Sequence, residues 1–226
     1  CSRARRPRPW MTVLALFLAF STAQLAAAVR LASPFGDHMV LQQGMPVPVW
    51  GTADAGSKVT VAFAGQTKTA TADAAGQWRV TLDALTASAV SRDLVVTETN
   101  RESKIVNHKC SDVLVGEVWL CGGQSNMERQ LGLRAGQKPI VNWEAEVAAA
   151  THPLIRQLYV EQTKASTPQS TVAASWSVCS PATAPDFTAV GYFFARDLHA
   201  SLGVPVGIIH SSWGGTPAEA WTGREG

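Results

Sequence analysis

Cysteine is scarce in this sequence, and the few cysteines are not spaced as metal ligands. The chain of 226 residues has four: Cys1, Cys110, Cys121 and Cys179. None of their spacings resembles a zinc site, and neither a metal nor an organic cofactor is expected. Cys1 belongs to an expected leader, so three remain, which allows either one disulfide with a free thiol or no disulfide. Cys121 ends an apolar run and is interpreted as a small buried residue.

The sequence also lacks an apolar run long enough to span a bilayer comfortably. The apolar run Met11–Phe20 is ten residues long, follows a segment with four arginines, and precedes small residues that end at Ala28. This pattern predicts a signal peptide over residues 1–28, cleaved after Ala28, with an uncleaved anchor as the alternative. We therefore expect an exported protein, periplasmic or extracellular, with no stable membrane insertion after cleavage.

An excess of basic residues is missing once the leader is set aside. The leader holds four of the 19 Lys and Arg and none of the 17 Asp and Glu, which leaves a net charge of −2. No nucleic-acid partner is therefore expected. A methionine at position 1 is also missing, and the sequence stops directly after a motif-like stretch. We interpret the chain as a fragment.

Residues 29–108 have the pattern of an all-β domain. Short β-branched or alternating runs recur about every ten residues and are separated by Gly and Asp turn signals. The predicted strands are 47–50, 58–63, 67–72, 77–82 and 93–99. This spacing predicts a small β-sandwich whose core contains Trp50, Phe63, Trp78 and Leu82. A sugar-binding role for the tryptophans is the alternative to core packing.

Residues 109–226 have the alternating pattern of an α/β domain. Strands are predicted at 113–120, 154–160 and 204–209, helices at 142–150 and 188–202, and a further helix starting at 219. The Ser-, Thr- and Pro-rich stretch 162–185 is predicted to be a loop that Trp176 anchors. The order predicts a parallel sheet with helices on its faces, and functional residues gather at the carboxyl ends of such strands.

Two glycine-containing turns follow strands of this predicted sheet. Ser125 follows Gly122-Gly123 after one intervening residue, Gln124, where a tight turn and a new helix would expose its hydroxyl beside backbone N–H groups. An oxyanion requires hydrogen-bond donors, and Gly214 and Gly215 offer backbone N–H groups that no Cβ atom obstructs. A nucleophilic serine is one interpretation; a serine that only caps the helix, and glycines that only form a turn, are the alternatives.

A general base for Ser125 is not evident. The histidines after the leader are His38, His108, His152, His199 and His210. Only His210 lies at the carboxyl end of a predicted strand, which makes it a speculative base. A buried, hydrogen-bonded histidine at a strand end is the alternative. His199 is expected on the solvated side of its helix.

Four stretches resemble the sialate O-acetylesterase family, within the SGNH hydrolase superfamily. They are Gly116–Met127 (GEVWLCGGQSNM), Ile209–Trp221 (IHSSWGGTPAEAW), Phe35–Gln43 and Ala189–Arg196. The resemblance covers most of residues 30–226. It implies a flavodoxin-like, three-layer α/β hydrolase domain after a β-sandwich, with Ser125 as the nucleophile. It also implies an oxyanion N–H from Gly214 or Gly215.

The family's Gly-Glu-Ser-Asn-type block and its Asp-x-x-His block are absent here. The resemblance therefore implies that the base lies beyond Gly226, that residues 109–226 are only the first part of the hydrolase domain, and that the chain alone is inactive. An incomplete hydrolase domain would also leave an apolar edge and apolar faces of its sheet uncovered. The implied activity is removal of O-acetyl groups from sialic acid or a polysaccharide, so an O-acetylated sugar is the expected partner. A non-catalytic carbohydrate-binding or scaffold protein with a vestigial serine loop is the alternative. An SGNH lipase or thioesterase is disfavoured because no long apolar stretch resembles an acyl-chain groove.

Overall fold

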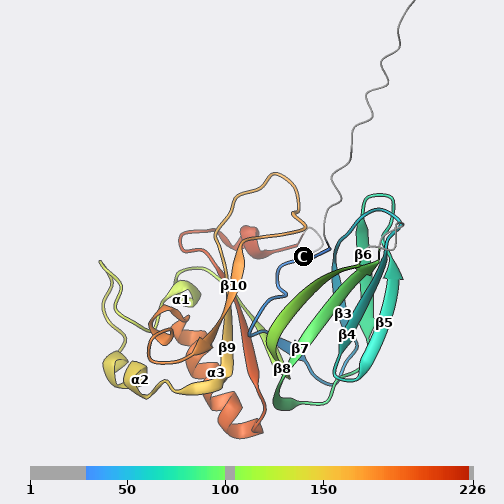
Figure 1. Cartoon of the computed structure of the whole chain (residues 1–226). Helices are drawn as coiled ribbons and strands as arrows, with labels where there is room; N and C mark the ends of the chain where they lie inside the picture. The colour runs from blue at the N-terminus through green and yellow to red at the C-terminus, as the bar shows by residue number, and fades with distance from the viewer. Residues whose placement is uncertain (1–28, 100–104, 224–226) are drawn as a thin grey trace, which may run out of the picture.

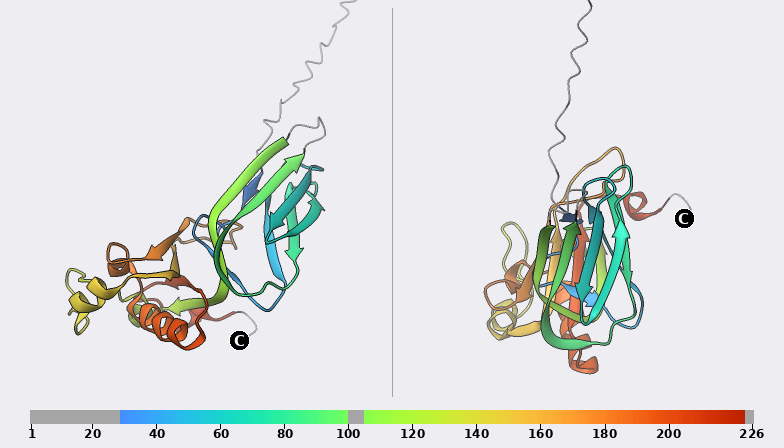
Figure 2. Two further views of the ribbon diagram at one scale, coloured as in Figure 1. Left: turned by 60° about the horizontal axis from the view of Figure 1, so that its bottom comes forward. Right: turned by 45° about the vertical axis from the view of Figure 1, so that its right-hand side comes forward.

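One long strand connects the two ends of the molecule. The computed structural model describes residues 29–99 and 105–223 (Figure 1), so the predicted signal peptide, residues 1–28, lies outside the described residues. Strand β8 (Ile105–Gly123) has 19 residues, which corresponds to about 60 Å of extended chain. Figure 2 shows an elongated molecule, with strands alone at one end and the helices at the other. The predicted boundary at residue 108 falls inside β8.

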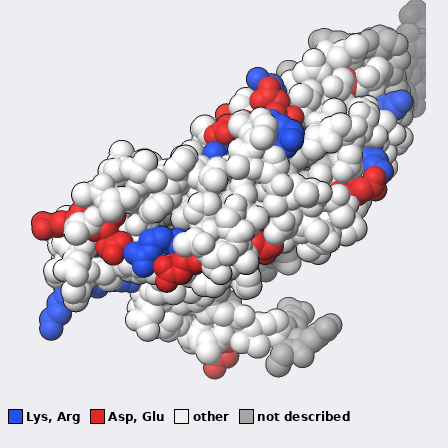
Figure 3. Space-filling model, turned by 90° about the horizontal axis from the view of Figure 1, so that it is seen from below, with Lys and Arg blue, Asp and Glu red and all other residues white. Residues whose placement is uncertain are grey.

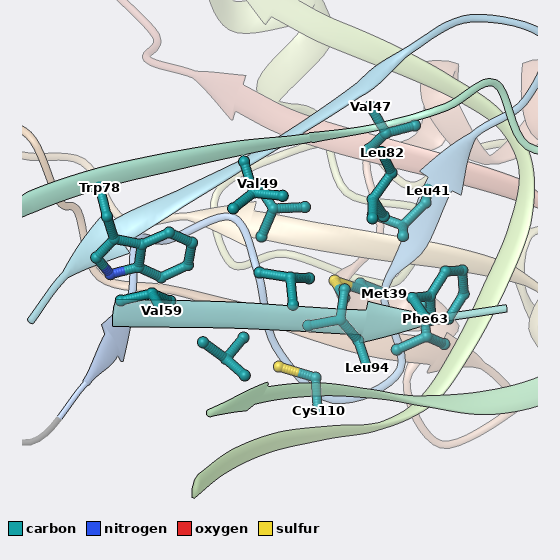
Figure 4. Close-up of a cluster of buried hydrophobic side chains, with 14 of the residues drawn as sticks. Met39, Leu41, Val47, Val49, Val59, Phe63, Trp78, Leu82, Leu94 and Cys110 are labelled. Carbon is teal, nitrogen blue, oxygen red and sulfur yellow. The ribbon is translucent and has the colours of Figure 1, made fainter. Parts of the chain in front are cut away.

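Two sheets face each other at the all-β end. Strands β1 (Arg30–Leu31), β3 (Val47–Thr52) and β6 (Gln77–Leu82) form one antiparallel sheet. The facing strands belong to an eight-stranded sheet. They are β4 (Lys58–Phe63), β5 (Gln66–Thr71), β7 (Ser88–Thr99) and the first half of β8. The short strand β2 (Val40–Gln42) pairs with β8 in parallel. The strands β4 and β6 have the predicted bounds. Residues in alternate positions point into a shared apolar core (Figure 4).

Three of the four predicted core residues are buried, and the fourth is not. Phe63, Trp78 and Leu82 are at most 3% exposed, which confirms their prediction. Trp50 is 36% exposed, so its assignment to the core was wrong. The reason is the two-residue period of β3, because Val47 and Val49 occupy the inward positions and leave Trp50 on the outer face.

The second half of β8 belongs to a parallel set of strands. β11 (Val206–Ser212) pairs in parallel with both β8 and β9 (His152–Val160). The order is therefore β9-β11-β8, whereas a flavodoxin-like sheet places its first strand between the second and the third. A Cβ on Gly116 would lie 1.9 Å from the Pro205 carbonyl oxygen, so the glycine permits the close approach of the segment that enters β11.

The predicted loop 162–185 was wrong in its second half. β10 (Ala174–Cys179) pairs antiparallel with β9 at the edge of the sheet, and a short 3₁₀ helix, η1 (Ala184–Asp186), follows. Pairing with β9 overrides the polar local composition, because the ladder supplies partners for the backbone groups. Trp176 is 9% exposed and its indole N–H donates to the Pro34 carbonyl at 2.7 Å, which confirms it as an anchor.

The helices lie at the end of the molecule that contains the parallel strands (Figure 1). The short helices are α1 (Ser125–Glu128), α2 (Trp143–Ala149) and the 3₁₀ turn η2 (Ala218–Trp221). Helix α3 (Ala189–Leu202) connects β10 to β11 and ends, as predicted, at Gly203, whose φ is +67°. Its buried face is centred on Gly191, Tyr192 and Ala195.

Part of the apolar surface of α3 is exposed. Val190, Phe194 and Leu202 are 40–51% exposed, and Phe194 makes an edge-to-face contact with the half-exposed Trp119 of β8 at 5.1 Å. Gly191 explains the rotation, because a Cβ there would lie 3.2 Å from the Cys121 sulfur and 3.3 Å from Ile208. The helix therefore packs closely against the sheet at Gly191, its smallest residue.

The three cysteines of the described residues are free and buried. Burial raises the pKa of Cys110 and Cys121 to about 11 and that of Cys179 to about 12. The interpretation of Cys121 as a small buried residue is confirmed, and of the two alternatives the structure has no disulfide among these three. Within residues 29–99 and 105–223, no helix is long and apolar enough to cross a membrane. On the face shown in Figure 3, acidic and basic side chains lie in small mixed groups.

Candidate active site

Ser125 is held at the exposed end of β8. The strand ends at Gly123, whose φ of +136° is a conformation that other residues rarely adopt, and Ser125 begins α1. The Ser125 hydroxyl donates to the side-chain oxygen of Gln124 at 3.3 Å, and the amide of Gln124 donates to the Thr216 carbonyl at 2.6 Å. The N-cap of α1 is Gln124, with no side-chain capping bond. Ser125 is therefore an exposed hydroxyl and does not act as a helix cap.

The two glycine-containing turns meet at the ends of neighbouring strands. The N–H of Trp213 donates to the Gly123 carbonyl at 2.9 Å, because β8 and β11 are parallel neighbours that end together. A Cβ on Gly214 would lie 3.6 Å from the Ser125 hydroxyl oxygen. Gly215 has a φ of +78° and open space where a Cβ would be. Gly214 is thus the glycine beside Ser125, and Gly215 provides the conformation of the turn.

Glu128 is the residue of this site that the sequence analysis missed. Its carboxylate accepts hydrogen bonds from the Gly214 N–H at 2.7 Å, the Gln162 amide at 3.1 Å and Arg134 at 3.4 Å. Burial by itself would raise the pKa of Glu128, but the bonds from Gln162 and Gly214 and the charge of Arg134 outweigh it and lower the pKa. A carboxylate one helical turn after the serine was the available signal.

The contact with Glu128 has a consequence for Gly214. A backbone N–H that donates at 2.7 Å to a carboxylate makes a strong, charge-assisted bond. In this state the Gly214 N–H is therefore occupied, and a second anion would have to share it or displace Glu128. The same carboxylate connects α1 to the segment after β9 through Gln162, whose amide also donates to the Ser212 carbonyl at 3.0 Å.

His210 is not placed to act as the base, which corrects that speculation. The side chain is 1% exposed, and its Nε2 lies 2.6 Å from the Ser212 hydroxyl. Its ring packs edge-on to Tyr159 at 5.5 Å, and Nδ1 has no hydrogen-bond partner among the described residues. Burial lowers the pKa of His210, although the Met127 carbonyl and the charge of Glu128 oppose this. The alternation of β11 turns His210 inward with Ile208, whereas Ser125 lies on an exposed turn.

None of the hydrogen bonds among the described residues joins a histidine to Ser125. His38 pairs with Asp112 at 2.7 Å, and His199 bonds the Val204 carbonyl at 2.7 Å, so His199 is only partly solvated. The described residues also contain no group of three or more His, Cys, Asp or Glu side chains that could hold a metal ion. Among the described residues the site therefore has a hydroxyl and adjacent backbone N–H groups but no histidine that is hydrogen-bonded to the hydroxyl.

A cavity of about 780 Å³ lies beside these turns. Its walls come from the segment after β9 and the turn after β11, and they include Gln162, Lys164, Ser212, Trp213, Thr216 and Trp221. The indole N–H of Trp221 donates to the Thr216 hydroxyl at 2.7 Å, and the Lys164 ammonium lies 5.7 Å from the centre of the Trp213 ring. Aromatic walls with polar donors are typical of small-molecule sites.

Comparison with known proteins bears on this geometry. The sialate O-acetylesterase of Rattus norvegicus is 32% identical over 234 aligned positions, which cover 96% of this chain. That of Homo sapiens is 31% identical over 209 positions, or 85% of the chain. The chain belongs to a sialate O-acetylesterase-like family. No protein-family model matches it.

This sialate O-acetylesterase-like chain also has a similar solved structure. The crystal structure of a carbohydrate acetylesterase from Xanthomonas citri is 39% identical, with a TM-score of 0.75 over 86% of this chain and 42% of that one. The mixed α/β architecture is therefore shared with an acetylesterase. The chain spans 42% of the rat relative and 38% of the human relative.

Proposed function

We propose that this protein is an exported serine esterase that removes O-acetyl groups from carbohydrate. The observation that carries the proposal is the meeting of the two turns, with Gly214 beside an exposed Ser125 hydroxyl at the end of β8. The names of the rat and human relatives and of the X. citri structure support an O-acetylated sugar as the substrate. Sialic acid and a polysaccharide both remain candidate substrates.

In the proposed reaction, the Ser125 oxygen attacks the carbonyl carbon of the acetyl ester, and the sugar hydroxyl leaves with a proton. Water then hydrolyses the acetyl-enzyme and releases acetate. The Gly214–Gly215 turn supports the oxyanion of each tetrahedral intermediate, which shares the Gly214 N–H with the Glu128 carboxylate or displaces it. The proton acceptor is proposed to be a residue other than the described histidines, since none of them is hydrogen-bonded to Ser125.

The test measures acetate release from an O-acetylated sugar and from p-nitrophenyl acetate by the complete product of the gene. Replacement of a catalytic serine usually lowers kcat by several orders of magnitude, so Ser125→Ala is expected to lose at least ~10³-fold. Ser201→Ala is the matched control, because Ser201 is exposed near the end of α3, outside the site. Equal turnover by Ser125→Ala and the unmodified protein would exclude the nucleophile.

A non-catalytic carbohydrate-binding protein is the second candidate. It is supported by the carboxylate of Glu128 at the Gly214 N–H and by the lack of a base beside Ser125 among the described residues. Under this alternative the unmodified protein would release no acetate and would still bind the sugar. Measurement of both quantities on one preparation separates the two candidates.

A further inference from the structure

The outer face of the sheet β1-β3-β6 contains a cavity far along the chain from Ser125. Its volume is about 1030 Å³, and its walls include Trp50, Phe35, Arg30, Arg79, Thr171 and Val172. Trp50 is the residue that the sequence analysis wrongly placed in the core, and its indole is available because β3 turns it outward. A large aromatic side chain in a cavity has a different role from one in a core and requires its own explanation.

The surroundings of Trp50 hold its ring in place and leave it accessible. Phe35 packs against it edge-to-face, with ring centres 4.8 Å apart and an interplanar angle of 79°. Arg79 lies directly opposite Trp50 in the register of β3 and β6, and the next outward pair is Thr52 opposite Gln77. The cavity therefore combines one supported aromatic face with guanidinium, hydroxyl and amide groups.

A glycine brings the third strand into this arrangement. A Cβ on Gly51 would lie 1.9 Å from the carbonyl oxygen of Arg30, so only glycine lets β1 approach β3 so closely. This contact places Arg30 on the opposite side of the cavity from β6, because β3 lies between β1 and β6. The two arginines therefore flank the tryptophan.

The segment before β10 connects this cavity to the one beside Ser125. Thr171 and Val172 are walls of both cavities. The N–H of Val172 donates to the Ser33 hydroxyl at 2.8 Å, which fixes the segment to the residues that follow β1. In Figure 1 this loop curves from β10 toward the first strands of the sandwich. One extended ligand could therefore occupy the two cavities on either side of the same segment.

We propose that the cavity at Trp50 binds a sugar ring of a carbohydrate chain, at a distance from the ring whose ester is cleaved. The apolar C–H face of a pyranose fits an aromatic ring, and its hydroxyl groups need the donors and acceptors that flank Trp50. The inference rests on the proposed function for the position of the acetylated ring. It makes the substrate an oligosaccharide or polysaccharide rather than a free monosaccharide.

The binding test uses the complete gene product with Ser125→Ala, so that no ester is consumed. Its probes are xylohexaose, a neutral chain, and 3′-sialyllactose, an anionic one, titrated by calorimetry. Adding Trp50→Ala is expected to weaken binding of the preferred probe about tenfold or more, and Trp50→Phe should retain most of the affinity. Arg79→Ala should weaken only the sialylated probe if the ligand is anionic.

The control is Trp119→Ala, because Trp119 is also exposed, at 45%, and lies in neither cavity. It should leave binding unchanged. Failure of both probes to bind, or equal affinities for Trp50→Ala and the parent protein, would overturn the inference. So would an equal loss from Trp119→Ala.

Kinetics separate this inference from the esterase proposal. With Ser125 intact, Trp50→Ala should raise the KM for an O-acetylated polysaccharide and leave turnover of p-nitrophenyl acetate unchanged, since that small ester cannot reach Trp50. Trp50-dependent binding without any acetate release would refute the esterase and support the sugar site. Normal esterase activity together with sugar binding that is independent of Trp50 would support the esterase and refute the sugar site.

Discussion

Glu128 provides the sharpest test of how the two turns are held together. Its side chain is 21% exposed, and its carboxylate accepts hydrogen bonds from the Gly214 N–H at 2.7 Å and the Gln162 amide at 3.1 Å. Hydrogen bonds to charged groups contribute about 1.5–3 kcal/mol each when well buried, and partial exposure places these two near the lower end. The third partner, Arg134, is 3.4 Å away and 40% exposed, so it adds little.

Glu128→Ala is therefore expected to lower the free energy of unfolding by about 3 kcal/mol. For a chain of this length each kcal/mol corresponds to about 2–4 °C in Tm, so the midpoint should fall by about 6–12 °C. Thermal unfolding followed by circular dichroism at pH 7 measures this. Glu144→Ala is the matched control, because Glu144 is exposed in the first turn of α2 and accepts no hydrogen bond that the structure records.

The same prediction has a pH dependence. The folded pKa of Glu128 is lowered, so its stabilisation is complete above its ordinary value of 4.5 and is lost as the pH falls through the folded pKa. The difference in Tm between the unmodified protein and Glu128→Ala should therefore shrink below about pH 4.5. A Tm within 1 °C of the unmodified protein at pH 7 would refute the reasoning, and so would a difference that grows on acidification.

Two further predictions concern the glycine turn and the thiols. Gly214→Ala would place a Cβ 2.3 Å from a Glu128 carboxylate oxygen and 3.6 Å from the Ser125 oxygen. The carboxylate must move, so Tm should fall by no more than it does in Glu128→Ala, and kcat for p-nitrophenyl acetate should fall at least about tenfold. Unchanged kcat would contradict a role beside Ser125. Burial raises the pKa values of Cys110, Cys121 and Cys179 to about 11, 11 and 12. These thiols should therefore react with Ellman's reagent only after the protein is unfolded. Rapid labelling of the folded protein at pH 8 would show that they are not buried.

The elements that local pattern predicts well are those in which pattern and pairing agree. Strands β4 and β6 alternate cleanly and were predicted with their observed bounds, and α3 begins within one residue of its prediction. β10 was missed because it is short and lies within a Ser-, Thr- and Pro-rich stretch, and because its strand conformation depends on pairing with β9, which lies more than ten residues earlier. The boundary at residue 108 stays a prediction, although β8 runs through it.

The candidate site divides in the same way. Ser125, Gly214 and Gly215 were identified from two short motifs, and the parallel pairing of β8 with β11 explains why distant motifs meet. Glu128 was missed because its importance comes from contacts with Gly214 and Gln162, on other segments. His210 was considered because it lies at a strand end, and the inward direction of its side chain excludes it.

By itself, the sequence determined the all-β and α/β segments and the motifs at Ser125 and Gly214, because hydrophobic period and turn residues act locally. Only the tertiary structure decided that β11 lies beside β8, that Glu128 binds the glycine turn, and that Trp50 faces a cavity. These features depend on which strand faces which, and on a one-residue shift between inward and outward positions. The motifs at Ser125 and Gly214 were therefore recognisable in the local sequence, whereas the contact between them and the position of Glu128 were not.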